Sequence, residues 1–240
     1  DELMMRAKTA AAVFSQYDQE QVDAIVRAAY LAGLDQRCQL AQAAVDETGM
    51  GRYPDKILKN TLATLLVYDT IRDQKTVGII REDDHDGIVE VAEPLGVILG
   101  VTPVTNPTST IMFKILLALK TRNAIIISPH QKAFQCSVAA ARLLYEAALD
   151  AGAPEDCVTW MDEPCREVSS GLMHHSGLAL ILATGGSSLV NAAYSSGTPA
   201  LGVGPGNVPV FVDASADLEL LATSVVSSKA FDNGVICASE

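Results

Sequence analysis

One cysteine stands apart from the other cysteines of the chain by its neighbours. Cys237 ends the segment Asp232-Asn233-Gly234-Val235-Ile236-Cys237. A thiol can add to a carbonyl and then hold the acyl group as a thioester, and a nearby glycine lets the backbone approach a ligand closely. A single cysteine more often packs as a small hydrophobic residue. Cys237 is therefore a candidate nucleophile whose case depends on the rest of the chain.

Asn106 is a candidate for stabilising negative charge. It follows an apolar run and lies between two prolines, Pro103 and Pro107. A side-chain amide held rigidly at such a point can donate a hydrogen bond to a developing oxyanion. The alternative is that Asn106 caps the helix expected to begin near Pro107.

A second glycine-rich turn suits an anionic ligand. Thr184-Gly185-Gly186-Ser187 follows an apolar run and precedes a helical pattern. Backbone N–H groups at a helix N-terminus bind phosphate. The turn does not match GxGxxG, so an ordinary tight turn remains the alternative.

Composition excludes several classes of protein. The 240 residues are 49% hydrophobic and 19% charged, which is typical of a packed globular chain rather than a disordered one. The net charge of −12 argues against nucleic acid as a partner and against an anionic membrane surface. The apolar runs are too short to span a bilayer, so we expect no membrane association.

The cysteines and histidines predict neither disulfides nor a metal. The five cysteines lack CxxC spacing, which indicates a reducing compartment, either the cytoplasm or an organelle matrix. His174 and His175 are adjacent, so on a helix they diverge by about 100° and suit one metal poorly. His130 is open between a cofactor contact and a structural role. The chain starts at Asp1, and we expect that residues upstream have been removed.

The first 75 residues read as helices. Asp18 and Gln21 form a predicted capping box, and Pro54 suits the first turn of a later helix. In that helix an apolar stripe is expected to face the core; it consists of Ile57, Leu58, Leu62, Leu65 and Leu66.

The residues after 75 predict a hairpin followed by an α/β region. Runs 76–80 and 87–91 read as two short strands joined by an acidic turn. Beyond them, apolar runs alternate with helical patterns, as in a Rossmann-like parallel sheet with helices on both faces. The expected strands are 96–101, 124–128, 157–160, 178–183, 200–203 and 208–212, and the expected helices are 107–119, 133–151, 163–173, 188–196 and 217–228.

Several segments together carry a family resemblance. They include Thr105-Asn106-Pro107-Thr108-Ser109-Thr110, Ser128-Pro129-His130, Leu182-Ala183-Thr184-Gly185-Gly186, Gly202-Val203-Gly204 with Gly206-Asn207, and Phe231 to Glu240. In this order the chain resembles the aldehyde dehydrogenase superfamily, in particular the CoA-acylating acetaldehyde dehydrogenase half of the bifunctional aldehyde-alcohol dehydrogenases. The resemblance runs from about residue 21 to the last residue.

The resemblance implies a domain division and a reaction. Residues 1–75 would pack on the cofactor domain, 76–93 form the hairpin, 94–228 bind NAD, and 229–240 begin the catalytic domain of a longer polypeptide. Cys237 would be the nucleophile, with Asn106 and the Cys237 backbone N–H holding the oxyanion. The dinucleotide would be lined by Val101, Thr102, Pro103, Val104, Thr105, Asn106, Gly186 and Gly204.

The second half-reaction and the partners are also expectations from the resemblance. Water-using relatives carry a glutamate where this chain has Gly202, so the thioacyl enzyme is expected to react with coenzyme A instead of water. A short aldehyde, with acetaldehyde as the expected one, and CoA are then the substrates. A homo-oligomer, extending to a filament, is expected. The alternatives are a water-using aldehyde dehydrogenase, a related acyl-phosphate reductase, and a non-catalytic assembly module of a filament-forming enzyme.

Overall fold

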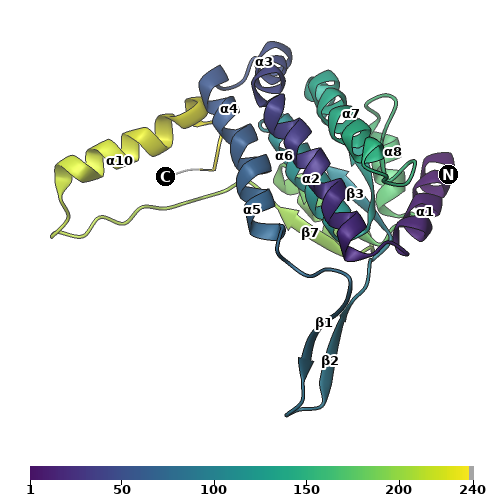
Figure 1. The fold of residues 1–240 in the computed structure, drawn as a ribbon. Coiled ribbons are helices and arrows are strands. Elements are labelled where there is room, and N and C mark those ends of the chain that lie inside the picture. Colours follow the sequence, from purple (N-terminus) through teal and green to yellow (C-terminus); the bar gives the residue numbers. More distant parts are fainter. Residues whose placement is uncertain (238–240) are drawn as a thin grey trace.

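Five parallel strands form the centre of the protein in the computed structural model, which describes residues 1–237 (Figure 1). Their order is β5-β4-β3-β6-β7. The two central apolar strands, β3 and β4, are buried along their whole length, as expected of parallel strands covered on both faces. The bounds are β3 (Val97–Val101), β4 (Ala124–Ser128), β5 (Val158–Trp160), β6 (Leu180–Thr184) and β7 (Ala200–Val203).

Helices cover this sheet. α6 (Pro107–Lys120) and α7 (Phe134–Asp150) pack on β3, β4 and β5, and α1 (Glu2–Phe14) packs against the same three strands. α9 (Ser187–Tyr194) packs on β6 and β7, and α8 (Arg166–Met173) precedes β6. The predicted α/β fold, with its parallel sheet and covering helices, is confirmed.

The N-terminal helices form an outer layer on α6 and α7. These are α2 (Gln19–Asp35), α3 (Arg37–Thr48), α4 (Tyr53–Thr61), a π-helical turn (Leu62–Leu66) and α5 (Val67–Ile71). The predicted capping box is present: Asp18 Oδ1 accepts from the Gln21 backbone N–H, and Gln21 Oε1 accepts from that of Asp18. Pro54 lies in the first turn of α4, as predicted.

The predicted orientation of α4 is wrong. Leu58, Leu62 and Leu66 are 52%, 48% and 51% exposed, whereas the buried residues of α4 are Asp55, Lys56, Lys59 and Asn60. The charged face turns inward because it meets partners in the C-terminal segment, described below. An apolar stripe is therefore left at the surface of the described residues.

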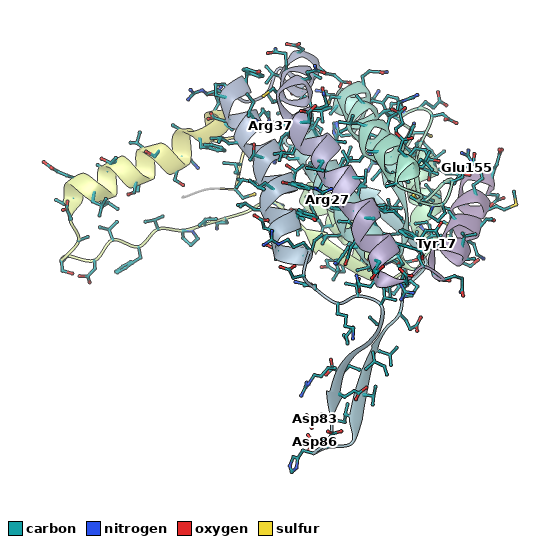
Figure 2. All side chains as sticks on the ribbon, in the orientation of Figure 1. Tyr17, Arg27, Arg37, Asp83, Asp86 and Glu155 are labelled. Carbon is teal, nitrogen blue, oxygen red and sulfur yellow. The ribbon has the colours of Figure 1, made fainter. Side chains whose placement is uncertain are left out.

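The hairpin projects from the body of the molecule, with its tip marked by Asp83 and Asp86 (Figures 1 and 2). It consists of antiparallel β1 (Gly78–Asp83) and β2 (Ile88–Ala92), with a register shift between Ile79 and Arg81. Its apolar side chains are exposed, namely Ile79, Ile80, Ile88, Val89 and Val91.

After β7 the chain leaves the sheet and then returns to α4. The predicted strand 208–212 is wrong: this stretch forms no strand, and Phe211 is 92% exposed. Within the described residues only Val208 forms an isolated bridge, and no ladder of pairs continues from it. α10 (Leu218–Ala230) extends away from the sheet (Figure 1), and the 3₁₀ turn Phe231–Gly234 packs against α4. Within residues 1–237, no helix is long and apolar enough to cross a membrane.

Candidate active site

The candidate site lies where the carboxyl ends of the parallel strands meet. The chain order places β4 and β5 on one side of β3, and β6 and β7 on the other. The neighbouring strands β3 and β6 are therefore followed by loops that lead to opposite sides of the sheet. Ligands of open α/β sheets bind in the crevice at such a switch point. The loop 102–106 follows β3, and Gly185 and Gly186 follow β6.

The loop after β3 presents an unsatisfied polar atom. Thr102 is buried; its backbone N–H donates to the Ser128 carbonyl oxygen at 3.1 Å, while its Oγ1 has no hydrogen-bond partner within residues 1–237. Buried polar atoms are nearly always paired. A polar ligand at this loop would supply the missing partner, which fits the predicted dinucleotide site.

The two glycines after β6 keep the start of α9 open. A Cβ on Gly185 would lie 2.7 Å from Leu189 Cδ2, so a larger residue there would displace the Leu189 side chain. Gly186 is the N-cap of α9, and a Cβ there would meet nothing within 4 Å; the same holds for Gly204 after β7. The N-terminus of α9 is thus unobstructed, and its backbone N–H groups suit a pyrophosphate.

Asn106 does not cap α6 with its side chain. It occupies the N-cap position, yet no cap hydrogen bond from the side chain forms. Its Oδ1 instead accepts from Lys59 Nζ at 2.6 Å, and its Nδ2 donates to Thr105 Oγ1 at 3.2 Å. The helix-cap alternative is therefore wrong for this side chain, and the amide is oriented from α4.

Cys237 is exposed, and its sulfur faces a backbone amide. The Gly206 N–H donates to Cys237 Sγ at 3.2 Å. A Cβ on Gly206 would overlap Cys237 Cβ and would lie 2.6 Å from Sγ. The loop after β7 therefore approaches the thiol closely only because residue 206 is glycine.

A buried ion cluster holds the segment that carries Cys237. The Asp232 carboxylate is fully buried and pairs with Lys59, and with Lys56 at 3.0 Å. It also accepts from the Arg52 backbone N–H at 2.7 Å, while the Asp232 backbone N–H donates to Asp55 Oδ2 at 2.9 Å. Charged groups are buried only when paired and hydrogen-bonded in this way. The cluster was missed from the sequence.

The backbone around Asp232 is strained in order to reach α4. Asp232, Asn233 and Gly234 have φ of 52°, 55° and 73° in succession, and only glycine tolerates this region freely. On the facing side, Gly51 has φ of 78°, and a Cβ there would overlap the Asp232 carboxylate. The ion pairs, not local preference, hold this turn.

The partners of Asp232 stabilise its charged form. Burial alone would raise the pKa of the Asp232 carboxyl, but hydrogen bonds from Lys59, the Arg52 N–H and Lys56 outweigh it, and the pKa lies below its ordinary value. Burial lowers the pKa of Lys59, against the hydrogen bond that Lys59 donates to Asp232, which raises it. Asp232 is therefore held as the carboxylate.

A further buried lysine, Lys114, holds the start of the cofactor loop. Lys114 Nζ donates to the carbonyl oxygens of Val101 and Leu182, at 2.5 and 2.6 Å, which joins the ends of β3 and β6. Burial without a carboxylate partner lowers its pKa to about 7. Sequence reasoning missed Lys114 because it lies among apolar residues of a core helix.

Gly202 has no room for a catalytic side chain. It lies inside β7, and a Cβ there would be 2.7 Å from Val190 Cγ1 and 3.0 Å from Tyr194 Cε2. Residues 198–212 contain no aspartate or glutamate. Strand β7 and the loop that follows it as far as residue 212 therefore offer no carboxylate base.

The histidines take part in local turns. His130 Nδ1 accepts from the Lys132 N–H, and His175 Nδ1 accepts from the Gly177 N–H. His174 Nδ1 bonds the Ser170 carbonyl oxygen. Among residues 1–237, no three His, Cys, Asp or Glu side chains are grouped so as to hold a metal.

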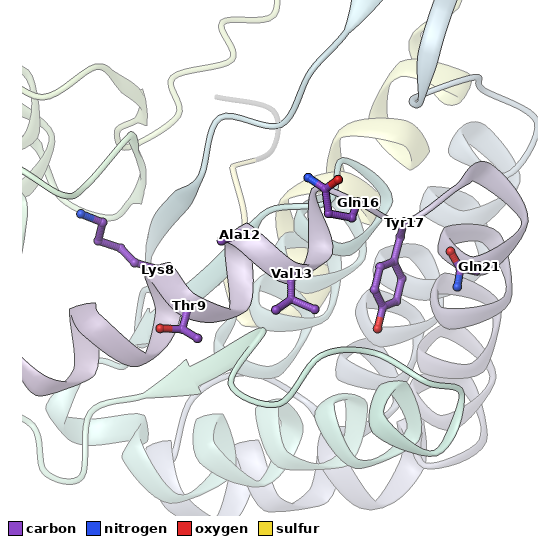
Figure 3. A pocket seen from close by; sticks show the side chains of 7 residues that line it. All are labelled: Lys8, Thr9, Ala12, Val13, Gln16, Tyr17 and Gln21. Atoms are coloured by element: carbon purple, nitrogen blue, oxygen red, sulfur yellow. The ribbon is translucent and has the colours of Figure 1, made fainter.

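A groove along α1 lies at the opposite end of the strands from the candidate site (Figure 3). Tyr17 in this groove donates to the Gly152 carbonyl oxygen in the loop before β5, and the Ser15 carbonyl nearby accepts from Arg122, just before β4. The groove is therefore at the amino ends of the strands, away from the site. Its lining residues are Lys8, Thr9, Ala12, Val13, Gln16, Tyr17 and Gln21.

Comparisons with known proteins identify the family of the chain. The profile of the aldehyde dehydrogenase family matches residues 1–240. The bifunctional aldehyde-alcohol dehydrogenase of Escherichia coli K12 is 52% identical over 238 residues, which is 99% of this chain and 27% of that protein. The chain thus spans about a quarter of the length of this curated relative.

Two solved structures are similar over nearly the whole chain. An acetylating aldehyde dehydrogenase from Geobacillus thermoglucosidasius has a TM-score of 0.96 at 46% identity, covering 100% of this chain and 53% of that one. A Rhodopseudomonas palustris propionaldehyde dehydrogenase with bound CoA and an acylated cysteine has a TM-score of 0.87 at 32% identity, covering 99% and 54%. With the family profile matched from end to end, the chain belongs to the aldehyde dehydrogenase family.

Proposed function

We propose that this chain supplies the nucleophile and the dinucleotide site of a CoA-acylating aldehyde dehydrogenase, which converts a short aldehyde such as acetaldehyde to its acyl-CoA, reversibly and with NAD. The observation that carries the proposal is the Cys237 thiol, which is exposed and accepts a hydrogen bond from Gly206 N–H beside the carboxyl edge of the sheet. The likeness to enzymes that are themselves acetylating supports the use of CoA.

Each residue of the proposed site has a separate role in the reaction. Cys237 Sγ, as the thiolate, adds to the aldehyde carbon, and the carbonyl oxygen becomes an oxyanion. The Asn106 amide and the Cys237 backbone N–H donate to that oxygen. After loss of hydride the acyl group remains on sulfur as a thioester. The thiolate of CoA then attacks the thioester carbon, acyl-CoA leaves, and Cys237 is released as the thiolate.

NAD, when bound, supplies the hydride acceptor. Residues Val101 to Asn106 would line it. Gly186 would lie at its pyrophosphate, and Gly204, in the loop after β7, would also line it. The unpaired Thr102 Oγ1 and the open N-terminus of α9 support this placement. We assign residues 94–228 to the dinucleotide domain, with 1–75 packed on it, 76–93 as hairpin and 229–240 opening the catalytic domain.

The lack of a carboxylate in residues 198–212 favours CoA over water as the acyl acceptor. Without a general base near the thioester, water attacks slowly, whereas a thiolate needs no such base. The water-using alternative would need a base from residues elsewhere. The five free thiols favour a reducing compartment, the cytoplasm or an organelle matrix.

The projecting hairpin favours assembly between copies of the protein. Its exposed Ile88, Val89 and Val91 present apolar surface on an unpaired two-stranded ribbon, and such edges pair readily with other chains. A homo-oligomer, extending to a filament, is proposed on this basis. Val89→Glu should lower the molecular mass found by light scattering, whereas Glu82→Gln at the same hairpin should not.

The test of the proposed reaction is Cys237→Ala in the full-length enzyme. NADH formation from acetaldehyde and CoA should be abolished, while NAD binding measured by fluorescence titration stays within about threefold. Cys165→Ala, at a half-buried thiol in another part of the fold, should retain activity. Turnover by Cys237→Ala would contradict the proposal.

A further inference from the structure

The Asn106 side chain is hydrogen-bonded by the ammonium group of Lys59, which lies on a different helix. Lys59 Nζ donates to Asn106 Oδ1 at 2.6 Å. Lys59 lies on α4, 47 residues before Asn106, and is buried. This contact determines which end of the Asn106 amide faces the ammonium.

An ammonium can only donate hydrogen bonds, so it selects the oxygen of the amide. If the Asn106 amide were flipped, its NH₂ group would face Lys59 Nζ and two donors would oppose each other in a buried place, which is costly. The Nδ2 end is therefore directed away from Lys59. One Nδ2 hydrogen goes to Thr105 Oγ1, and within residues 1–237 the other has no acceptor.

The same ammonium also holds the nucleophile's segment. Its other two partners are the Asp232 carboxylate and the Val235 carbonyl oxygen, the latter at 2.6 Å. An ammonium has three hydrogens, and here all three are used. Val235 precedes Cys237 by two residues, so one side chain ties the Asn106 amide to the cysteine segment.

We infer that Lys59 is a positioning residue for the oxyanion site: it fixes the Asn106 amide with its N–H toward the substrate oxygen, at a set place relative to Cys237. The inference rests on the proposed function. A positive charge on the carbonyl side of an amide also polarises its N–H groups, which strengthens the bond they donate. Lys59 itself does not touch the substrate.

Lys56 provides a matched control within the same cluster. Its Nζ pairs with the same Asp232 carboxylate, but its other bond goes to the Thr105 carbonyl oxygen at 2.6 Å, not to the Asn106 side chain. Removing Lys56 therefore disturbs the ion cluster without freeing the Asn106 amide. A loss of kcat on removing Lys59 that is larger than the loss on removing Lys56, and that disappears when Asn106 is absent, is therefore attributed to positioning of the Asn106 amide.

The test is a double-mutant cycle in the full-length enzyme with acetaldehyde, NAD and CoA. Asn106→Ala should lower kcat by about 100-fold or more, and Lys59→Met by about 10- to 100-fold with the KM for NAD changed less than about threefold. In the Asn106→Ala background, Lys59→Met should cost no more than about threefold further. The reductions in kcat caused by Lys56→Met and by Asn106→Ala should multiply in the double variant. Alkylation of Cys237 by iodoacetamide should keep its rate within about threefold in Lys59→Met.

The outcomes separate the inference from the function on which it rests. Wild-type enzyme without CoA-dependent NADH formation would overturn the proposed function and the inference together. If Asn106→Ala lowers kcat but the effect of Lys59→Met multiplies with it, Lys59 positioning is overturned and the oxyanion role stands. If Lys59→Met does not fold, Lys59→Met with Asp232→Asn, compared with Asp232→Asn alone, removes both charges and gives the same readings.

Discussion

The Gly206 backbone nitrogen lies 3.2 Å from Cys237 Sγ and donates a hydrogen bond to it, across 31 residues of chain. The loop after β7 and the segment after α10 thus meet at the thiol. Neither residue 206 nor residue 237 is held there by a regular element. The contact depends on the absence of a side chain at residue 206 and on the ion cluster that anchors Asp232.

The first prediction concerns Gly206→Ala. The added methyl would overlap Cys237, so the thiol must move and lose its backbone donor. We expect kcat/KM for the aldehyde to fall by about tenfold or more, with little change in thermal stability because both residues are exposed. Gly171→Ala, on α8 where a Cβ meets nothing within 4 Å, is the control. Equal activity of the two variants would contradict a close approach of residue 206 to the sulfur.

The second prediction concerns the ion cluster. Asp232→Asn keeps the shape of the side chain but leaves two buried ammonium groups without their carboxylate. We expect the free energy of unfolding in urea to fall by about 3–5 kcal/mol at pH 7. Asp83→Asn, at the exposed tip of the hairpin, should change it by less than about 0.5 kcal/mol.

That difference should depend on pH in a definite direction. The pKa of Asp232 is lower in the folded state than in the unfolded chain. Its stabilisation is therefore complete above the ordinary carboxyl pKa of about 4 and is lost as the pH falls through the folded value. Wild type and Asp232→Asn should converge in stability below about pH 4. A difference that widened on acidification would show that Asp232 is not the carboxylate of the cluster.

The third prediction concerns Lys114. Its folded pKa of about 7 lies below the ordinary 10.5, so between these values the unfolded chain binds more protons than the folded one, and stability rises with pH. Lys114→Met removes this dependence. The free energy of unfolding of wild type minus that of the variant should increase from pH 7 to pH 10, by at most about 4 kcal/mol. Parallel pH curves for the two proteins would mean that Lys114 keeps an ordinary pKa.

The fourth prediction concerns thiol reactivity. Burial raises the pKa of Cys136, together with a hydrogen bond to Glu47, and burial raises the pKa of Cys157 to about 12. Only thiolates are alkylated readily. Brief treatment with iodoacetamide at pH 8, followed by peptide mass spectrometry, should label exposed Cys237 and leave Cys136 and Cys157 unlabelled until denaturant is added. Labelling of Cys157 before Cys237 would contradict the structure.

Much of the fold was predictable because it depends on local signals. The buried strands β3 and β4 are continuous apolar runs, and the capping box at Asp18 needs only residues three apart. The alternation in residues 208–212 wrongly predicts a strand, because alternation of apolar residues does not report pairing, and in the described residues only Val208 forms an isolated bridge. Cys237 and Asn106 were singled out from motifs.

The interior of the site was not predictable from the same signals. The stripe Leu58, Leu62 and Leu66 suggested the wrong buried face for α4, because periodicity counts apolar residues and ignores what the charged ones can pair with. Lys56 and Lys59 are buried because Asp232, more than 170 residues later, enters from the cysteine segment. A carboxylate that arrives from so far along the chain leaves no local trace in the sequence.

The central claim is that the acyl group on Cys237 is passed to CoA and not to water. With acetaldehyde and saturating NAD but no CoA, stopped-flow absorbance should show a burst of about one NADH per active site followed by slow turnover, and adding CoA should restore steady turnover. Rapid steady formation of NADH and acetate without CoA would contradict the account and return the enzyme to the water-using class.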